Sequence, residues 1–354
     1  MQIACKALTS STLFLLFVKL LIVTQKVDRQ DPILGFFHGW IQEFARQCSQ
    51  VIVFGQSVKE HSLPQNVTVF SLGKEKGFSR IRQIFRYHRL LWKNRKEYDV
   101  VFVHMTPIWV VLALPAILCC RKRMYLWYEA RGTRWPLKIA LILACKVFSA
   151  SEKGMPIATR KSVITGHGID TMFFSPGTEG RDKNMILTVG RITAAKQIPV
   201  MLHALIALPA NYRLLVAGTT ITRNDEMLFH ELERTIAELD LIGRVEFSEV
   251  LPQDMPGVLQ CAAVFLHASL TGLDKALLEA MACGCLVVSC AEAAHAVLPA
   301  ACLSTADGMA ERVKTLLNLP DIEQEALGHQ LRHIVIQKHS LEKLVKRLVQ
   351  EMAI

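Results

Sequence analysis

The sequence predicts two α/β domains in tandem, each built on a doubly wound parallel sheet. Short apolar runs bounded by turn residues alternate with helix-length segments along the whole chain. The length of 354 residues exceeds what one core of ordinary size needs. Residues 166–184, rich in glycine and polar turn residues, separate two such series, so we place the junction there. Hydrophobic residues make up 51% of the chain and charged residues 20%, which excludes disorder as its general state.

The elements of the first series follow from buried runs such as KLLIVT at residues 19–24. Strands are predicted at 19–24, 50–54, 67–71, 99–104, 123–128, 146–149 and 161–165, with helices at 35–48, 79–96, 107–119 and 136–144. The second series has strands at 185–189, 213–217, 244–247, 264–267 and 286–289, each followed by a helix. Apolar residues at helical spacing then predict an amphipathic helix at 340–354.

The N-terminal residues allow two interpretations. The apolar run at 13–23 is interrupted by Lys19 and is too short to span a bilayer. A secretory signal peptide is one interpretation, but no small-residue cleavage site follows. We favour a first strand at 19–24, which makes residues 1–17 an upstream extension or a misassigned start. The predicted domains are then 18–167 and 168–339, with 340–354 as a terminal helix that packs back on the first domain.

The charge is divided unevenly between the two halves. Up to residue 176 there are 25 basic and 10 acidic residues, whereas the remainder has 16 basic and 21 acidic residues. The predicted helix at 79–96 is both basic and amphipathic. Two interpretations stay open: docking on an anionic membrane surface, or a solvated basic face on a helix whose apolar stripe covers the sheet. The chain has no nucleic-acid-binding motif, so we expect no nucleic acid partner. The ten cysteines have no zinc spacing and are expected to be buried free thiols.

A ligand site is predicted in the segment SLTGLDKALLEAMACGCLVVS at 269–289. A strand here meets a turn with Gly272 and then a helix that carries Glu279. Backbone amides at such a turn, together with a helix N-terminus, suit a phosphate group. A carboxylate on the helix suits the vicinal hydroxyls of a ribose.

The segment ILTVGRITAAK at 186–196 adds a second part of the site. A buried strand ends at Gly190, and Arg191 and Lys196 follow it. Open α/β sheets bind ligands at the carboxyl ends of their strands, where two cations can converge on one diphosphate.

These motifs, in their order, identify a family resemblance. VGR-x4-K, then LLEAMACG, with GHGID-x3-F-x-P at the junction, resembles the C-terminal domain of family 4 glycosyltransferases of the GT-B architecture. In that architecture two Rossmann-like domains face each other across a cleft. The first domain resembles the family through KLLIVT, a loop with Gly35, and YDVVFVHM at 98–105.

The resemblance implies a function. It implies transfer of a sugar from a nucleotide-diphosphate donor to a glycan or lipid-linked acceptor, with retention and without a metal or other cofactor. We expect this in envelope polysaccharide or glycolipid synthesis, with the protein cytoplasmic and peripheral on the inner face of the membrane. A catalytically silent nucleotide-sugar-binding protein and a GT-B nucleotide-sugar epimerase remain alternatives.

The resemblance also implies roles for individual residues. Arg191 and Lys196 match the pair that stabilises the leaving diphosphate, and Glu279 matches the glutamate that contacts the ribose. The remaining positions near the donor are the glycines and turn residues Gly35, Gly190, Gly272 and Leu273.

The chain departs from the family pattern at two positions. The family has a paired-glutamate motif, in which Glu279 matches the second glutamate. Thr271 stands at the position of the first, eight residues earlier, and Asp274 and Lys275 are candidates to compensate for the missing carboxylate. A histidine usual at the end of a first-domain strand is replaced by Ala130, with Glu129 beside it as a candidate catalytic substitute.

Overall fold

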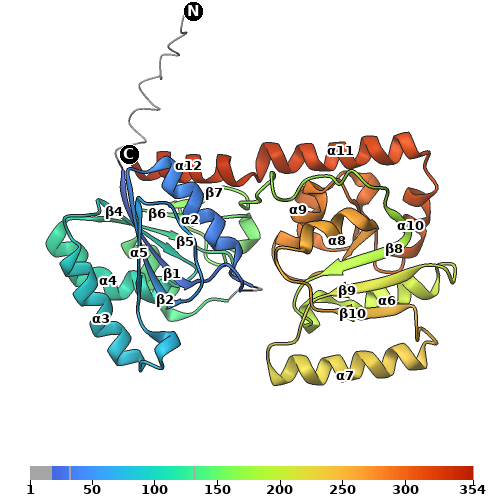
Figure 1. Ribbon diagram of the computed structural model, residues 1–354, viewed down its shortest axis with the longest axis horizontal. Coiled ribbons are helices and arrows are strands. Elements are labelled where there is room, and N and C mark those ends of the chain that lie inside the picture. The colour runs from blue at the N-terminus through green and yellow to red at the C-terminus, as the bar shows by residue number, and fades with distance from the viewer. Residues whose placement is uncertain (1–17, 32, 131, 354) are drawn as a thin grey trace, which may run out of the picture. The chain divides into compact units, whose positions relative to one another are not determined.

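The computed structural model describes residues 18–31, 33–130 and 132–353 (Figure 1). The predicted extension, residues 1–17, lies outside the described residues. The chain divides into two compact units. The first comprises the described residues up to Gly168 together with those from Leu341 onward, and the second is Ile169–Ser340. Each unit contains one parallel sheet with helices on both faces, which confirms the predicted α/β class.

The first unit is built on a seven-stranded sheet in the order β3-β2-β1-β4-β5-β6-β7. Its strands are β1 (Lys19–Val27), β2 (Gln50–Val58), β3 (Val67–Ser71), β4 (Val100–His104), β5 (Arg123–Trp127), β6 (Lys146–Ser149) and β7 (Ser162–Ile164). Its helices are α2 (Phe36–Gln47), α3 (Arg80–Lys93), α4 (Pro107–Cys120), α5 (Trp135–Leu143) and the terminal α12 (Leu341–Ala353), with short 3₁₀ turns η1 (Lys74–Lys76) and η2 (Glu152–Gly154).

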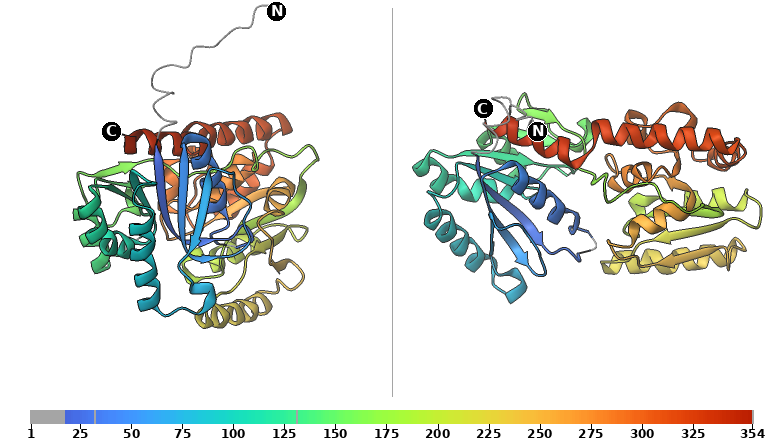
Figure 2. Two further views of the ribbon diagram at one scale, coloured as in Figure 1. Left: turned by 60° about the vertical axis from the view of Figure 1, so that its left-hand side comes forward. Right: turned by 45° about the horizontal axis from the view of Figure 1, so that its top comes forward.

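Helices cover the two faces of the first sheet in two groups. The strand residues that face one side pack with α3, α4 and α5, and those that face the other pack with α2 and α12. Figures 1 and 2 show α12 lying alongside α2. Strand residues are buried on both faces, which explains why these strands are nearly continuous apolar runs rather than alternating ones.

The second unit has a five-stranded sheet in the order β10-β9-β8-β11-β12. Its strands are β8 (Asp182–Val189), β9 (Arg213–Ala217), β10 (Val245–Ser248), β11 (Ala262–His267) and β12 (Leu286–Ser289). Its helices are α6 (Ile198–Ile206), α7 (Arg223–Glu238), α8 (Met255–Cys261), α9 (Lys275–Ala282), α10 (Met309–Leu317) and α11 (Asp321–Lys338), with 3₁₀ turns η3 (Ala194–Lys196), η4 (Glu292–Ala296) and η5 (Ala300–Cys302).

Several strands are longer than their apolar runs predict. The strand β1 continues to Val27 and pairs there with Val58 of β2. The strand β8 begins at Asp182, inside the segment expected to be a linker, and Asp182 pairs with Ala262 of β11. Backbone pairing with a neighbour extends both strands into polar sequence, where hydrophobicity gives no signal.

Two further findings bear on location and chemistry. No helix among the described residues is long and apolar enough to cross a membrane. The described cysteines are free, but Cys119, Cys145 and Cys261 are exposed, which corrects the expectation that all are buried. Cys119 and Cys261 lie on the outer sides of helices, and Cys145 lies between α5 and β6.

Candidate functional site

The predicted residues of the second unit lie around the point where its strand order reverses. The chain proceeds from β8 to β9 and β10 on one side, and returns to β11 and β12 on the other. The loops that leave the carboxyl ends of β8 and β11 therefore meet, which is where open α/β sheets bind ligands. A hydrogen bond from the Leu270 amide to the Ala195 carbonyl, 2.8 Å long, joins the two loops.

The loop after β8 requires glycine for two reasons. Gly190 has a φ of 136°, a conformation that other residues rarely adopt. A Cβ at this position would lie 2.5 Å from Nζ of Lys196, whose side chain folds over the glycine. A Cβ on Gly218, after β9, would lie 2.0 Å from the Gly190 carbonyl oxygen. The backbone of this loop is thus held against its neighbour, with Lys196 across it.

Lys196 makes an ion pair with Asp274, the residue that caps α9. Its ammonium contacts Oδ2 of Asp274 and donates to the Val189 carbonyl at 3.2 Å. The imidazole of His267, at the end of β11, places Nε2 3.6 Å from the same carboxylate and Nδ1 2.9 Å from the Ser289 hydroxyl. Burial by itself would raise the pKa of Asp274, but the charge of Lys196 and the contact with His267 outweigh it, so the pKa lies well below its ordinary value.

Arg191 points to a different partner, at the start of α7. Its guanidinium contacts Asp225 at 2.7 and 2.8 Å and the Thr222 hydroxyl at 3.2 Å. Thr222 and Asp225 form a capping box for α7. Burial would raise the pKa of Asp225, but hydrogen bonds from the Thr222 and Ile221 amides and from Arg191 outweigh it and lower the pKa to about 2.

The turn between β11 and α9 brings the remaining predicted residues into the same region. The hydroxyl groups of Ser269 and Thr271 lie 2.8 Å apart, and Thr271 is exposed. Glu279 is 9% exposed. Its Oε1 lies 2.7 Å from Nζ of Lys275, one helical turn earlier, and the two side chains form an ion pair. Gly272 and Leu273 lie within this turn, but it is Gly190 rather than Gly272 that has left-handed backbone.

Each predicted cation of the site therefore has a carboxylate partner within the chain. Lys196 pairs with Asp274, Arg191 with Asp225, and Lys275 with Glu279. The structure brings Lys196, Asp274 and the β11 turn together. Arg191 and Lys196 contact different carboxylates, Asp225 in the first turn of α7 and Asp274 at the N-cap of α9.

Gly35 lies in the first unit, immediately before α2. Its φ of −56° is ordinary, but a Cβ would lie 2.5 Å from the Asp31 carbonyl oxygen and 2.9 Å from that of Arg29. Close approach of the backbone, rather than an unusual dihedral angle, therefore requires glycine here.

Glu129, the candidate catalytic residue of the first unit, contacts the loop that follows β6. The strand β5 ends at Trp127, so Glu129 lies in the following loop. Its carboxylate accepts hydrogen bonds from the Ser149 and Ser151 hydroxyls at 2.7 and 2.8 Å and from the Ala150 and Ser151 amides at 2.7 and 3.2 Å. Both carboxylate oxygens thus hold the loop after β6.

His104 is a candidate that the sequence analysis did not single out. It ends β4 beside β1, where the strand order of the first sheet reverses. Its ring stacks on Phe37 at 4.0 Å and its Nδ1 lies 3.4 Å from the Thr24 hydroxyl. Burial lowers the pKa of His104 to about 3, so the ring is neutral near pH 7. The sequence does contain a signal for this residue, because His104 directly follows the apolar run VVFV in YDVVFVHM, where a buried strand ends.

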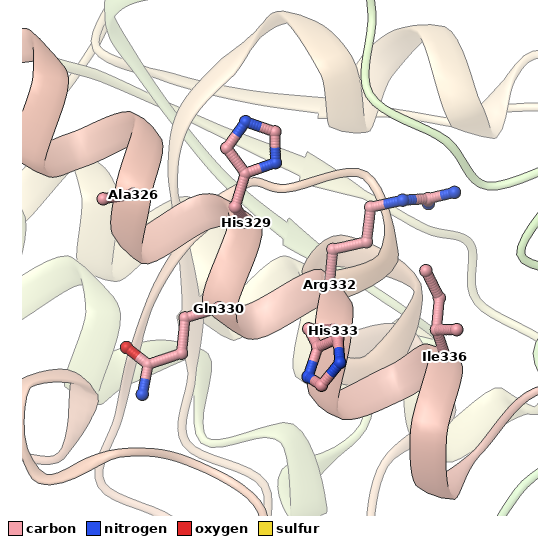
Figure 3. A pocket seen from close by; sticks show the side chains of 6 residues that line it. All are labelled: Ala326, His329, Gln330, Arg332, His333 and Ile336. Carbon is pink, nitrogen blue, oxygen red and sulfur yellow. The ribbon is translucent and has the colours of Figure 1, made fainter.

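Other surface features of the second unit do not involve the predicted residues. Six side chains of α11 line a depression of about 540 Å³. Figure 3 shows these side chains, with His329 and His333 one turn apart on the helix. Arg332, among them, donates to the Thr171, Phe174 and Ala282 carbonyls, a structural role. In the part of the chain that the structure describes, no group of three or more potential ligand side chains is placed to hold a metal ion.

Comparison with known proteins finds a family match within the second unit. Residues 183–319 match the family described as glycosyl transferases group 1. No curated protein matches the chain.

Solved structures match nearly the whole chain. HepE of Anabaena in complex with UDP and glucose is 15% identical, with 94% of this chain and 99% of that chain covered and a TM-score of 0.73. A further HepE structure contains UDP-glucose. Sucrose-phosphate synthase of Thermosynechococcus elongatus is 17% identical, with 94% and 98% covered and a TM-score of 0.73. An α,α-trehalose-phosphate synthase (UDP-forming) of Burkholderia xenovorans, in complex with glucose-6-phosphate, is 12% identical, with 94% and 99% covered and a TM-score of 0.69. These likenesses show the fold.

Proposed function

We propose that this chain, a GT-B glycosyltransferase with a glycosyl transferases group 1 domain at residues 183–319, transfers a sugar from a nucleotide-diphosphate donor that its second unit binds. One observation carries the proposal: the family match covers both loops that meet where the strand order of the second sheet reverses. A UDP-sugar is the first donor to test, because the HepE structures contain UDP and UDP-glucose.

Each residue of the site has a proposed role in donor binding. Lys196 and Arg191 bind the diphosphate, and Glu279 binds the ribose hydroxyl groups. Amides of the turn at Gly272 and Leu273 approach the phosphates. When the bond between the sugar and the diphosphate breaks, negative charge builds on the leaving group, and the fixed ammonium of Lys196 stabilises it electrostatically.

The proposed reaction is completed by an acceptor that the first unit binds, at loops that include Gly35. The acceptor is a glycan or a lipid-linked sugar of envelope polysaccharide or glycolipid synthesis, and transfer proceeds with retention and without a metal cofactor. The variant paired-glutamate motif, with Thr271 in place of the first glutamate, is that of a divergent member of family 4. We place the enzyme in the cytoplasm at the membrane surface.

A second candidate function is nucleotide-sugar binding without transfer. Two observations favour it: Thr271 carries no charge, and Asp274 already neutralises Lys196. An assay that follows both donor consumption and acceptor product separates the two functions. Product formed from donor alone would instead indicate the epimerase reaction.

The decisive experiment removes the predicted phosphate contacts. Lys196→Ala and Arg191→Ala are each expected to weaken UDP-sugar binding and transfer about tenfold or more, because a charge-assisted hydrogen bond contributes roughly 1.5–3 kcal/mol. Isothermal titration and initial rates with UDP-, GDP- and ADP-sugars measure both effects.

The controls separate loss of contact from loss of structure. Lys183→Ala and Arg213→Ala remove exposed cations of the same unit that also pair with aspartates, and should leave binding unchanged. The double variant Lys196→Ala/Asp274→Asn leaves no unpaired carboxylate at this position. Its affinity for the UDP-sugar should be reduced as in Lys196→Ala alone. Unchanged affinity in both alanine variants would place the donor site elsewhere.

A further inference from the structure

Three adjacent helices of the first unit lie in a strongly basic stretch of the sequence. Residues 79–151, which span α3, α4 and α5, include 14 lysines and arginines and only 3 acidic residues. These helices cover the same side of the sheet, where Tyr87, Val110 and Leu137 pack into one core cluster. Their outer sides therefore form one continuous side of this unit.

The outer side of α3 carries an apolar stripe, whereas a helix whose apolar residues cover the sheet would have that stripe buried. Its buried residues are Gln83, Tyr87, Leu90 and Leu91. Ile81, Phe85 and Trp92 are 68%, 72% and 51% exposed. At 100° per residue these three lie within 40° of one another and nearly opposite the buried side. The solvated-face interpretation is thus wrong for these side chains, which do not cover the sheet.

The two neighbouring helices repeat this arrangement. On α5, Trp135, Ile139 and Ile142 are exposed at i, i+4 and i+7. The helix α4 between them has no charged residue, and its Leu118 is exposed. These seven side chains, here called the three-helix face, are Ile81, Phe85, Trp92, Leu118, Trp135, Ile139 and Ile142.

Tryptophan placement distinguishes this face from the rest of the described chain. Trp40, Trp109 and Trp127 are buried, and the two exposed tryptophans are both on the three-helix face. Exposed tryptophan beside basic residues is typical of surfaces at the boundary between water and lipid.

We propose that the three-helix face docks on an anionic lipid bilayer, with its apolar side chains among the headgroups and the surrounding arginines and lysines on lipid phosphates. The proposal rests on the proposed function only in that a lipid-linked acceptor would be found at such a surface. Charge complementarity selects the bilayer as the occupant. A second copy would bring the same positive charge, and a nucleic acid would leave the exposed isoleucines without apolar contacts.

Some cations near the face have contacts that hold them in place. The Arg82 guanidinium stacks on Phe78 at 3.6 Å, and that of Arg95 lies 4.8 Å from the Trp92 ring. Lys122 pairs with Asp99 at 3.7 Å. Arg82, Arg89 and Lys93 follow one another along the side of α3 that adjoins its apolar stripe, where a membrane surface would meet them together.

The test is co-sedimentation with phosphatidylcholine vesicles that contain or lack phosphatidylglycerol. The full chain is expected to bind the anionic vesicles, with affinity that falls as salt is added, and not the neutral ones. The triple variant R82E/R89E/K93E should bind about tenfold more weakly or worse. F85S/I142S should also lose about tenfold while it keeps the salt dependence, since its charge is unchanged.

Matched variants of the second unit serve as controls. K183E/R213E/R234E changes the net charge by the same amount, and M227S/I242S removes two apolar side chains that are also mostly exposed. Both should bind like the unmodified chain. Trp fluorescence should shift to shorter wavelength on vesicle binding, and W92F/W135F should abolish the shift while the three buried tryptophans remain.

Three outcomes would overturn the proposal. They are equal binding to neutral vesicles, face variants that bind like their controls, and variants that change only the oligomeric state or RNA binding. The Lys196→Ala variant separates a failure of membrane docking from a failure of the proposed function. This variant should lose sugar transfer and still bind vesicles. An unmodified chain that binds vesicles but never consumes a donor would contradict only the proposed function.

Discussion

Asp274 is both the cap of α9 and the partner of the lysine proposed to bind the donor diphosphate. Its Oδ1 accepts from the Ala276 amide at 3.3 Å, and its Oδ2 contacts Lys196. A diphosphate that binds Lys196 must compete with this carboxylate. The residue therefore stabilises the ligand-free site at the expense of ligand affinity. Functional sites more often show the reverse exchange, in which stability is lower for the sake of function.

Replacing Asp274 with asparagine should have opposite effects on stability and on binding. We expect the ligand-free variant to lose about 1–3 kcal/mol of unfolding free energy, because Lys196 keeps its charge without its partner. UDP affinity should rise about tenfold, since the carboxylate no longer competes. Chemical denaturation and titration calorimetry measure the two quantities.

The pH dependence of this effect follows from the direction of the pKa shift. The carboxyl pKa lies well below its ordinary value, so the carboxylate is ionised from mildly acidic to alkaline pH. Its stabilising contribution is complete above the ordinary carboxyl pKa and is lost as the pH falls from there through the lowered pKa. The affinity difference should therefore be constant between about pH 6 and 8. Asp321→Asn, which removes the exposed partner of Lys183, should change neither quantity, and weaker UDP binding by Asp274→Asn would show that the carboxylate positions Lys196 instead.

At the scale of elements, α12 shows how periodicity and topology combine. Its apolar residues recur at helical spacing, and the structure buries Leu341, Leu344 and Leu348 against α2 and the sheet of the first unit. The Tyr125 hydroxyl donates to the Met352 carbonyl, and Lys146 pairs with Glu351 at 2.6 Å. The spacing predicts an amphipathic helix, but only the fold shows which surface the helix covers.

Truncation of a central α12 side chain should therefore destabilise the first unit. Leu348→Ala is expected to cost about 2–5 kcal/mol of unfolding free energy, because Leu348 is fully buried and its loss leaves a cavity. Urea denaturation followed by tryptophan fluorescence reports on this unit, which contains all five tryptophans. Ile322→Ala on α11 removes a side chain that is 75% exposed and should change the free energy little. Equal effects of the two substitutions would contradict the docking of α12.

At the scale of the whole molecule, the first unit is discontinuous in sequence. The chain leaves it after Gly168 and returns at Leu341. The two ends of the second unit meet, because the Ile169 amide donates to the His339 carbonyl at 2.8 Å. The second unit is thus an insertion whose ends are adjacent, which lets its stability respond separately to a ligand.

A donor should protect the second unit from hydrogen exchange in particular places. With UDP in about hundredfold excess over its Kd, bound protein gains about 2.7 kcal/mol, and we expect slower exchange at 186–196 and 267–279. Mass spectrometry of exchanged peptides measures this, with Lys196→Ala as the control that should show little protection. Protection confined to the first unit would assign nucleotide binding there.

The sequence by itself determined the α/β class, the position of each described strand and the segments that carry the candidate donor site. Buried parallel strands are continuous apolar runs, and glycine at the end of a strand marks a close backbone approach, so both leave a local signal. Only the tertiary structure decided the partners of the charged residues and the direction of the α3 apolar stripe. Ion pairs such as Lys196 with Asp274 join residues 78 apart, and the side of a helix that meets the sheet depends on its packing. Neither is encoded in local spacing.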